Sequence, residues 1–183
     1  GGFPGAGGGY HPEGYKPVSK LIILRGNSGS GKSSAAKALQ RELGRNTLMI
    51  SQDTVRREML WARDGEDTPA IPLLIHLLRY GYEHHTVVIL EGILYADWYR
   101  PVFEAAAALF GKQIYAYYYD LPFEETLRRH ATKKNRFSFG EKEMRRWWRD
   151  RDHIGLIPEK SIGAEVSLDE AVHMILSDIQ AEK

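Results

Sequence analysis

The chain has 183 residues, of which 43% are hydrophobic and 27% are charged, a size and composition typical of one compact domain. Its 25 Lys and Arg residues nearly balance 24 Asp and Glu residues, so a net charge of +1 gives no overall field to attract DNA or an anionic membrane. The absence of cysteine excludes disulfides, thiol catalysis and thiolate metal sites and leads us to expect a cytoplasmic protein, and no apolar run has the length of a membrane span.

The first twenty residues are rich in glycine and proline and poor in apolar side chains. Such a composition cannot build a packed element. We therefore expect residues 1–20 to form a flexible arm, or an addition made for expression, and residues 21–183 to form a single domain.

The first predicted strand, residues 21–24, leads into Gly26–Ser33, which fits the pattern G-x-x-x-x-G-K-[ST]. A helix is predicted over residues 33–43, because apolar residues recur there at helical spacing. Backbone N–H groups of such a loop, together with the N-terminus of the following helix, bind phosphate. Lys32 is expected to reach the β- and γ-phosphates, and the hydroxyl of Ser33 to bind Mg²⁺. The expected nucleotide-binding residues are Gly26, Asn27, Ser28, Gly29, Ser30, Gly31, Lys32, Ser33 and Ser34.

Two other interpretations of Gly26–Ser33 are less favoured. A flexible Gly/Ser turn needs neither the apolar strand before it nor the helical pattern after it. A dinucleotide site would use Asp53 to hold a ribose, but its fingerprint requires Gly or Ala at the position of Ser34. The phosphate-binding loop remains the better interpretation.

Strands and helices are predicted to alternate along the rest of the chain. Ser138 and Ser167 each begin a capping-box pattern, which marks a helix start. Further strands are predicted over residues 48–50, 86–90 and 114–119, with a short fifth strand around 161–166. Further helices are predicted over residues 54–63, 68–84, 98–110, 122–134 and 141–152, and from residue 167 onward.

This alternation predicts an α/β fold, a three-layer sandwich with a mostly parallel five-stranded sheet. With the phosphate loop it is typical of the P-loop nucleoside triphosphate hydrolase fold, here with a helical lid. Ligands of such sheets lie at the carboxyl ends of the strands. We therefore expect Gly26–Ser33, residues 51–53 and residues 91–92 to meet in one site.

Two acidic residues at these strand ends suit phosphoryl transfer. Asp53 could accept the proton of an acceptor hydroxyl while the γ-phosphoryl group arrives, although it could also cap the helix that begins at Thr54. Glu91 could bind Mg²⁺ directly or through water, although it could instead cap the next segment or pair with a cation. We favour the catalytic role for Asp53 and the metal or substrate role for Glu91.

Residues 124–152 carry ten basic residues against six acidic ones. This segment could close over the phosphates as a lid that excludes water. The basic residues of 145–151 could equally form a solvated helix face with i,i+4 ion pairs. Trp147 and Trp148 could stack on a substrate ring, but adjacent aromatic residues on a helix more often pack against the protein. The basic residues are Arg128, Arg129, Lys133, Lys134, Arg136, Lys142, Arg145, Arg146, Arg149 and Arg151.

With these motifs in place, the chain resembles the P-loop kinases of small molecules and nucleic-acid ends. The run Ser-Gln-Asp ending at Asp53, followed by Arg56, is similar to the acceptor segment of polynucleotide and uridine kinases. The resemblance implies that Asp53 is the general base and that Arg56 binds the acceptor. The run Leu-Glu-Gly around Glu91 is similar to the third-strand ending of uridine kinases. Zeta-toxin and antibiotic-phosphotransferase kinases share this layout, so the resemblance leaves the acceptor open.

The lid provides a further part of the resemblance. Residues 127–130 followed by Lys133 are similar to the polynucleotide kinase lid, whose two cations lie four residues apart. This implies that Arg129 and Lys133 clamp the transferred phosphate, with Arg136 as a third candidate. Lys133 departs from the usual arginine and gives up bidentate geometry.

These features predict an ATP- and Mg²⁺-dependent kinase that phosphorylates a hydroxyl of a small molecule, such as a nucleoside-like or antibiotic compound. The acceptor segment is expected over residues 53–85 and the lid over residues 124–152. Two alternatives stay open: a kinase of RNA or DNA ends, and a nucleotide-binding switch with little catalysis. The sequence does not determine the oligomeric state or the preference for ATP over GTP.

Overall fold

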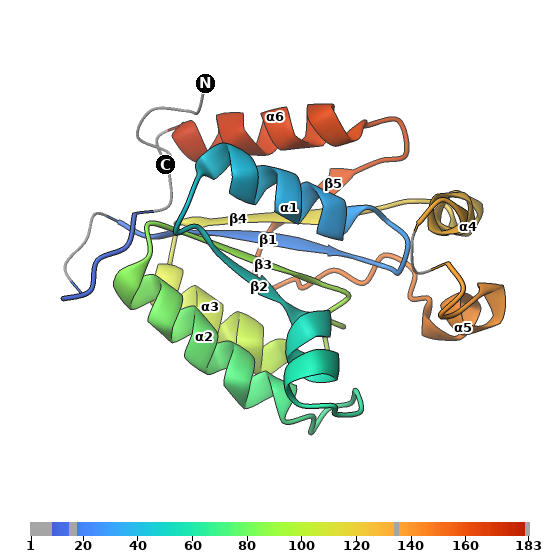
Figure 1. The fold of residues 1–183 in the computed structure, drawn as a ribbon, viewed down its shortest axis with the longest axis horizontal. Helices are drawn as coiled ribbons and strands as arrows, with labels where there is room; N and C mark the ends of the chain where they lie inside the picture. The colour runs from blue at the N-terminus through green and yellow to red at the C-terminus, as the bar shows by residue number, and fades with distance from the viewer. Residues whose placement is uncertain (1–8, 15–17, 134–135, 182–183) are drawn as a thin grey trace.

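Five parallel strands form one sheet in the computed structural model, which describes residues 9–14, 18–133 and 136–181 (Figure 1). Their spatial order is β2-β3-β1-β4-β5, so the strand that leads into the phosphate loop is the central one. The predicted five-stranded α/β fold is confirmed. The strands are β1 (Lys20–Gly26), β2 (Leu48–Ser51), β3 (Val87–Gly92), β4 (Ile114–Tyr119) and β5 (Glu159–Ile162).

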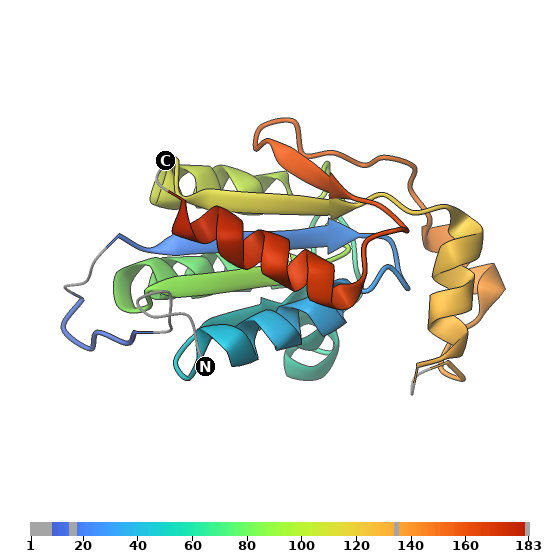
Figure 2. The ribbon, with the colours of Figure 1, turned by 90° about the horizontal axis from the view of Figure 1, so that it is seen from above.

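Helices cover both faces of the sheet and give it three layers (Figures 1 and 2). One face carries α1 (Lys32–Leu43) and α6 (Leu168–Gln180), and the other carries α2 (Ala70–His84) and α3 (Arg100–Phe110). Within the described residues, no helix has the length and hydropathy needed to cross a membrane.

The alternation of side chains along β1 explains why residues 21–24 of this strand are all apolar. Leu21 and Ile23 pack into the core beneath α2 and α3, whereas Ile22 and Leu24 pack into the core beneath α1 and α6. A strand covered on both faces has no solvent-facing side, as expected of a parallel sheet between helices. The phosphate loop is thereby anchored to a central strand that is buried on both faces.

Two short helices, α4 (Phe123–Ala131) and α5 (Glu141–Trp147), project beyond the carboxyl ends of the strands (Figures 1 and 2). Both end earlier than predicted, α5 by five residues, and Lys134 lies outside the described residues. The predicted cap at Ser138 is also wrong, because Gly140 precedes α5 and its N–H donates to the Glu143 carboxylate at 2.9 Å.

The predicted helix after β2 is shorter and of another type. It is a single π-helical segment, η1 (Thr54–Met59), so the predicted end at residue 63 is wrong. The second capping box is confirmed: Ser167 and Glu170 each accept the other's backbone N–H at 3.1 Å.

Part of the Gly/Pro-rich arm contacts the folded domain. Tyr10 forms an antiparallel bridge with His85, and the N–H of His11 donates to the carbonyl of His84 at 2.8 Å. Residues 1–8 and 15–17 lie outside the described residues, so a flexible arm stays a prediction for them.

Candidate functional site

The phosphate loop connects β1 to α1 and adopts a conformation that requires glycine. Gly29 and Gly31 have φ values of 81° and 103°, in the left-handed region that other residues rarely adopt. A Cβ atom on Gly29 would lie 2.6 Å from the carbonyl oxygen of Thr126, and one on Gly31 would lie 3.2 Å from the Arg129 guanidinium. The lid helix α4 therefore packs directly on the phosphate loop.

Lys32 begins α1 inside this loop, and only 8% of it is exposed. Its Nζ donates to the Asn27 carbonyl at 3.3 Å. Burial lowers the pKa of Lys32, while the Glu91 and Asp53 carboxylates oppose that shift and Lys133 adds to it. The three strand-end and lid residues therefore all act electrostatically on Lys32, as expected if they face one site.

Ser33 and Glu91 contact each other where the phosphate loop meets the end of β3. The hydroxyl of Ser33 donates to the Glu91 carboxylate at 3.2 Å, and Glu91 itself is buried at the end of β3. A hydroxyl and a carboxylate oxygen suit Mg²⁺, which takes one or two protein ligands and completes its shell with water and phosphate oxygens. No cluster of three or more His, Cys, Asp or Glu residues that could hold a metal occurs in the described part of the chain.

Asp53 lies at the carboxyl end of β2, immediately before η1, and its side chain is 63% exposed. Its carboxylate pairs with Arg57 at 2.8 Å and with Arg56 at 3.6 Å. It makes no capping hydrogen bond; instead Ser51 Oγ accepts the N–H of Thr54 at 3.3 Å. The capping alternative for Asp53 is therefore wrong, and its carboxylate stays accessible.

A chain of polar contacts continues from Asp53 into the acceptor segment. Arg56, 14% exposed, approaches Asp64 at 3.8 Å, and Asp64 accepts the hydroxyl of Tyr99 at 2.5 Å. Gln52 in turn donates to the Tyr99 hydroxyl at 2.7 Å. Burial, followed by the hydrogen bond to Asp64, raises the pKa of Tyr99 far above its ordinary value, so this phenol stays neutral.

The three basic residues predicted to act in the lid, Arg129, Lys133 and Arg136, differ from one another in their contacts. Arg129 donates to the Ser30 carbonyl of the phosphate loop at 2.6 Å and to Glu125 at 3.0 Å. Burial lowers the pKa of Lys133, and the charge of the Glu91 carboxylate opposes this shift. Arg136 is exposed and donates only to the Lys133 carbonyl among described groups, and its guanidinium lies over the Phe137 ring. In this conformation Arg129 contacts the phosphate loop and the charge of Glu91 acts on Lys133, whereas Arg136 makes no hydrogen bond to the loop within the described residues.

The remaining basic and aromatic lid residues make ordinary structural contacts. Arg145 pairs with Glu141 at 2.9 Å across one helical turn, and both are exposed. The rings of Trp147 and Trp148 pack edge-on against aromatic neighbours, Phe139 and Phe123 respectively. These contacts support the alternative of a solvated face and packed aromatic residues for this part of the lid.

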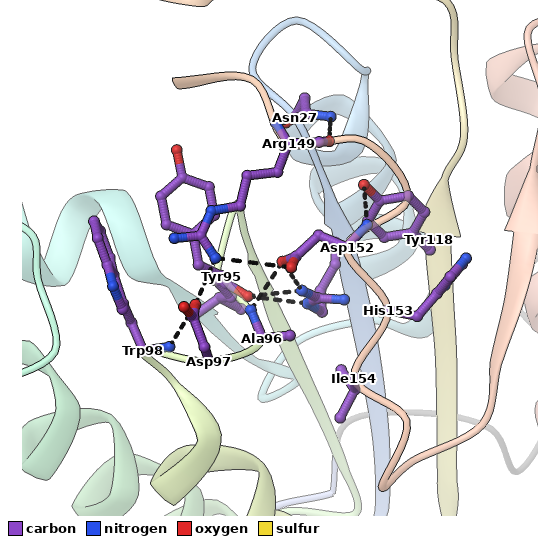
Figure 3. A network of polar contacts seen from close by, with 12 residues as sticks. Asn27, Tyr95, Ala96, Asp97, Trp98, Tyr118, Arg149, Asp152, His153 and Ile154 are labelled. Carbon is purple, nitrogen blue, oxygen red and sulfur yellow. Dashed lines mark hydrogen bonds and ion pairs between the residues drawn. The ribbon is translucent and has the colours of Figure 1, made fainter. Parts of the chain in front are cut away.

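The segment after α5 forms a polar network that the sequence patterns did not reveal (Figure 3). The Asn27 side chain donates to the Arg149 carbonyl at 2.7 Å and accepts the Arg149 N–H at 2.9 Å. The Arg149 guanidinium lies 3.8 Å from the Tyr95 ring centroid, 5.1 Å from that of Trp98, and 2.5 Å from Asp97. The loop between β3 and α3 is thus fixed to the phosphate loop through Arg149.

Arg25 anchors the same network to the sheet. It is fully buried and pairs with Asp152 and with Glu159, each at 2.9 Å. A second hydrogen bond of Asp152 comes from the N–H of Ala96 at 2.8 Å. The one feature of the sequence that could have indicated this network was Arg25, a charged residue directly after the apolar residues 21–24. These contacts also explain the early end of α5, because residues 148–152 leave the helix to form them.

A cavity of about 620 Å³ lies elsewhere, beside β4 and β5 and the C-terminal end of α3. It is lined mainly by apolar side chains, and none of the predicted site residues contributes to it. It is therefore separate from the phosphate loop.

Residues 21–153 of the chain match the AAA domain family. Several small-molecule kinases of known structure share the fold. An APS kinase from Mycobacterium tuberculosis, solved with AMPPNP and APS, is 18% identical with a TM-score of 0.65, and the match covers 91% of this chain and 100% of that one. A gluconokinase from Sinorhizobium meliloti 1021 is 16% identical with a TM-score of 0.61, and the match covers 90% of this chain and 94% of that one.

A tunicamycin resistance protein from Deinococcus radiodurans is similar to the same degree, with 17% identity, a TM-score of 0.61 and coverage of 90% and 97%. At such identities these matches establish a shared fold. No match to a curated protein was found.

Proposed function

Because the chain belongs to the AAA domain family through residues 21–153, we propose that it is an ATP-dependent phosphotransferase. The transferred group is the γ-phosphoryl group, and its acceptor is a hydroxyl of a small molecule such as a nucleoside-like or antibiotic compound. The kinase-like fold supports this proposal, as do the residues that surround the phosphate loop.

The observation that carries the proposal is the relation between Asp53 and Lys32. A carboxylate at the end of β2 acts electrostatically on the lysine of the phosphate loop, which supports a place for it beside the γ-phosphate of a bound nucleotide. The carboxylate is also accessible, and among the described residues it pairs only with Arg56 and Arg57. A phosphate-binding loop alone would serve a motor or a switch, whereas an exposed carboxylate opposite it suits a reaction with a second substrate.

In the proposed reaction, the loop amides and Lys32 hold the donor phosphates. Asp53 accepts the proton of the acceptor hydroxyl as that oxygen bonds to the γ-phosphorus, and the bond from the γ-phosphorus to the β,γ-bridging oxygen breaks to release ADP. Arg129 and Lys133 stabilise the charge on the transferring group and exclude water with the lid. Ser33 and Glu91 would hold Mg²⁺, which neutralises charge on the phosphate oxygens when bound.

The test is incubation of the full chain with γ-labelled ATP and a panel of nucleosides, antibiotics, sugars and oligonucleotides. Transfer of label to a hydroxyl compound supports the proposal. Tight ATP binding with label in no acceptor would instead indicate the nucleotide-binding switch. Label on oligonucleotide ends, with binding that weakens steeply as salt increases, would indicate the nucleic-acid kinase.

A further inference from the structure

The arginines around the acceptor side of the site are already paired with carboxylates. Arg57 pairs with Asp53 at 2.8 Å, and Arg56 approaches both Asp53 and Asp64 at 3.6 and 3.8 Å. Arg149 pairs with Asp97 at 2.5 Å and approaches Asp152 at 3.8 Å. An anionic acceptor that used one of these three arginines would have to displace its present partner and leave a carboxylate unpaired.

These ion pairs are connected to one another through the loop that contains Tyr95. The pKa of Tyr95 is raised, first by burial, and its neighbours Arg149 and Asp64 act on it in opposite directions. The N–H of Tyr99 donates to the Tyr95 carbonyl at 2.9 Å and the Tyr99 hydroxyl donates to Asp64 at 2.5 Å, so this loop connects the Arg149 network with the Asp64 contacts that lead back to Asp53. Arg63 is the exception to the pairing, since it is exposed and forms no ion pair within the described chain.

Trp61 lies on the same segment as Arg63, in a strained backbone conformation and with its side chain in solvent. It is 94% exposed, and its φ of 49° is in the left-handed region, which is strained for a residue with a bulky side chain. The two main-chain groups of the next residue are fixed: the Ala62 N–H donates to the Arg56 carbonyl at 2.9 Å, and the Ala62 carbonyl accepts from Arg56 Nη1 at 3.1 Å. Arg56 thus holds Trp61 outward at the edge of the acceptor segment.

We propose that the acceptor is an uncharged alcohol with a flat ring and that Trp61 is the residue that stacks on this ring. The inference rests on the proposed function and narrows its substrate class. A neutral acceptor leaves these arginine–carboxylate pairs intact. An exposed indole can stack on a flat ring without any hydrogen bond to that ring. Binding of the ring covers an aromatic side chain that no described residue covers.

The test compares acceptors that retain the same hydroxyls. Label transfer from γ-labelled ATP is measured for uridine, for methyl β-ribofuranoside, which lacks the base, and for 5-carboxyuridine, which adds a negative charge. Adenosine and chloramphenicol extend the uncharged ring-bearing group, and shikimate and gluconate extend the anionic group. We expect label on uncharged ring-bearing compounds, with kcat/KM at least about tenfold lower for ringless or anionic counterparts, a difference that one stacking contact can provide.

Preferred label on an anionic or ringless compound would overturn the substrate class and leave the proposed function intact, particularly if Arg63→Ala then removed the activity. Label on no compound would contradict the proposed function itself.

The role of Trp61 is tested separately on the ring-bearing acceptor that takes the most label. Trp61→Ala should raise its KM about tenfold with kcat nearly unchanged, while Trp61→Phe should restore KM to within about threefold, because the phenyl ring still stacks. ATP affinity should be the same in all three proteins. An unchanged KM in Trp61→Ala, or loss of an oligomer in that variant by sedimentation, would overturn the assignment of Trp61 to the acceptor.

Discussion

The side-chain amide of Asn27 binds both main-chain groups of Arg149, at 2.7 and 2.9 Å, and so joins the phosphate loop to the segment that follows the lid. Asn27 is itself buried. Since the side chain of Arg149 contacts Tyr95 and Trp98, the nucleotide loop and the loop after β3 are held in one arrangement. The second residue of the phosphate loop therefore has a structural partner in addition to its proposed place beside the nucleotide.

Asn27→Ala should destabilise the nucleotide-free protein. The substitution removes two partly buried hydrogen bonds to Arg149, each worth about 0.5–1.5 kcal/mol, and so costs about 1–3 kcal/mol of the free energy of unfolding. Urea denaturation would measure this loss. The control is Asp150→Asn at the exposed neighbour of Arg149, which should leave the free energy of unfolding nearly unchanged. Equal effects of the two substitutions would contradict the joining role of Asn27.

Gly29→Ala should disturb the contact between the phosphate loop and the lid. Its Cβ would approach the Thr126 carbonyl to 2.6 Å, whereas a Cβ on Gly44, which also has a positive φ, meets nothing within 4 Å. Gly44→Ala therefore reports backbone strain alone, and we expect Gly29→Ala to cost about 1–3 kcal/mol more in the free energy of unfolding. ATP affinity should also fall only in Gly29→Ala. Matching losses in both variants would show that α4 does not pack on the loop.

Lys32→Met should increase the stability of the nucleotide-free protein while weakening nucleotide binding. The pKa of Lys32 is lowered chiefly by burial, so the folded state disfavours the charged form. Replacing it should stabilise the fold by about 0.5–2 kcal/mol at neutral pH, the range typical of stabilising substitutions.

The sign of the pH dependence follows from the same shift. A lysine whose folded pKa lies below its unfolded value destabilises the fold most at low pH, and the penalty is relieved as the pH rises toward the unfolded value of about 10.4. The advantage of Lys32→Met in denaturant melts should therefore shrink between pH 7 and pH 10. An advantage that grew over this range, or unchanged ATP affinity by titration calorimetry, would contradict the buried phosphate-binding role.

The sequence predicted the features that depend on local patterns. Buried strands such as β3, the Gly26–Ser33 loop and the Ser167 cap are each determined by residues close together in the chain. The parallel direction of the strands followed from the alternation of strands and helices, because strands joined through helices run parallel.

The patterns failed where distant contacts override local preference. Residues 148–152 suit a helix, yet their hydrogen bonds to Asn27 and the ion pair of Asp152 with Arg25 draw them out of it. The π-helical form of η1 likewise has no local signature in the sequence. The chain leaves this helix after Met59, and the hydrogen bonds between Arg56 and Ala62 fix the turn that follows. Tertiary contacts between residues far apart in sequence decided both cases.

The most direct test of the account is phosphoryl transfer by Asp53→Asn at saturating ATP, with ATP affinity measured in the same preparation. Asparagine keeps the shape of the side chain but cannot accept the acceptor's proton, so we expect transfer to fall by at least about 100-fold while the Kd for ATP stays within about threefold. Asp67→Asn, at an exposed position of the same segment, is the control and should transfer at the wild-type rate. Turnover of Asp53→Asn near the wild-type rate would contradict the assignment of Asp53 as the base and, with it, the central claim.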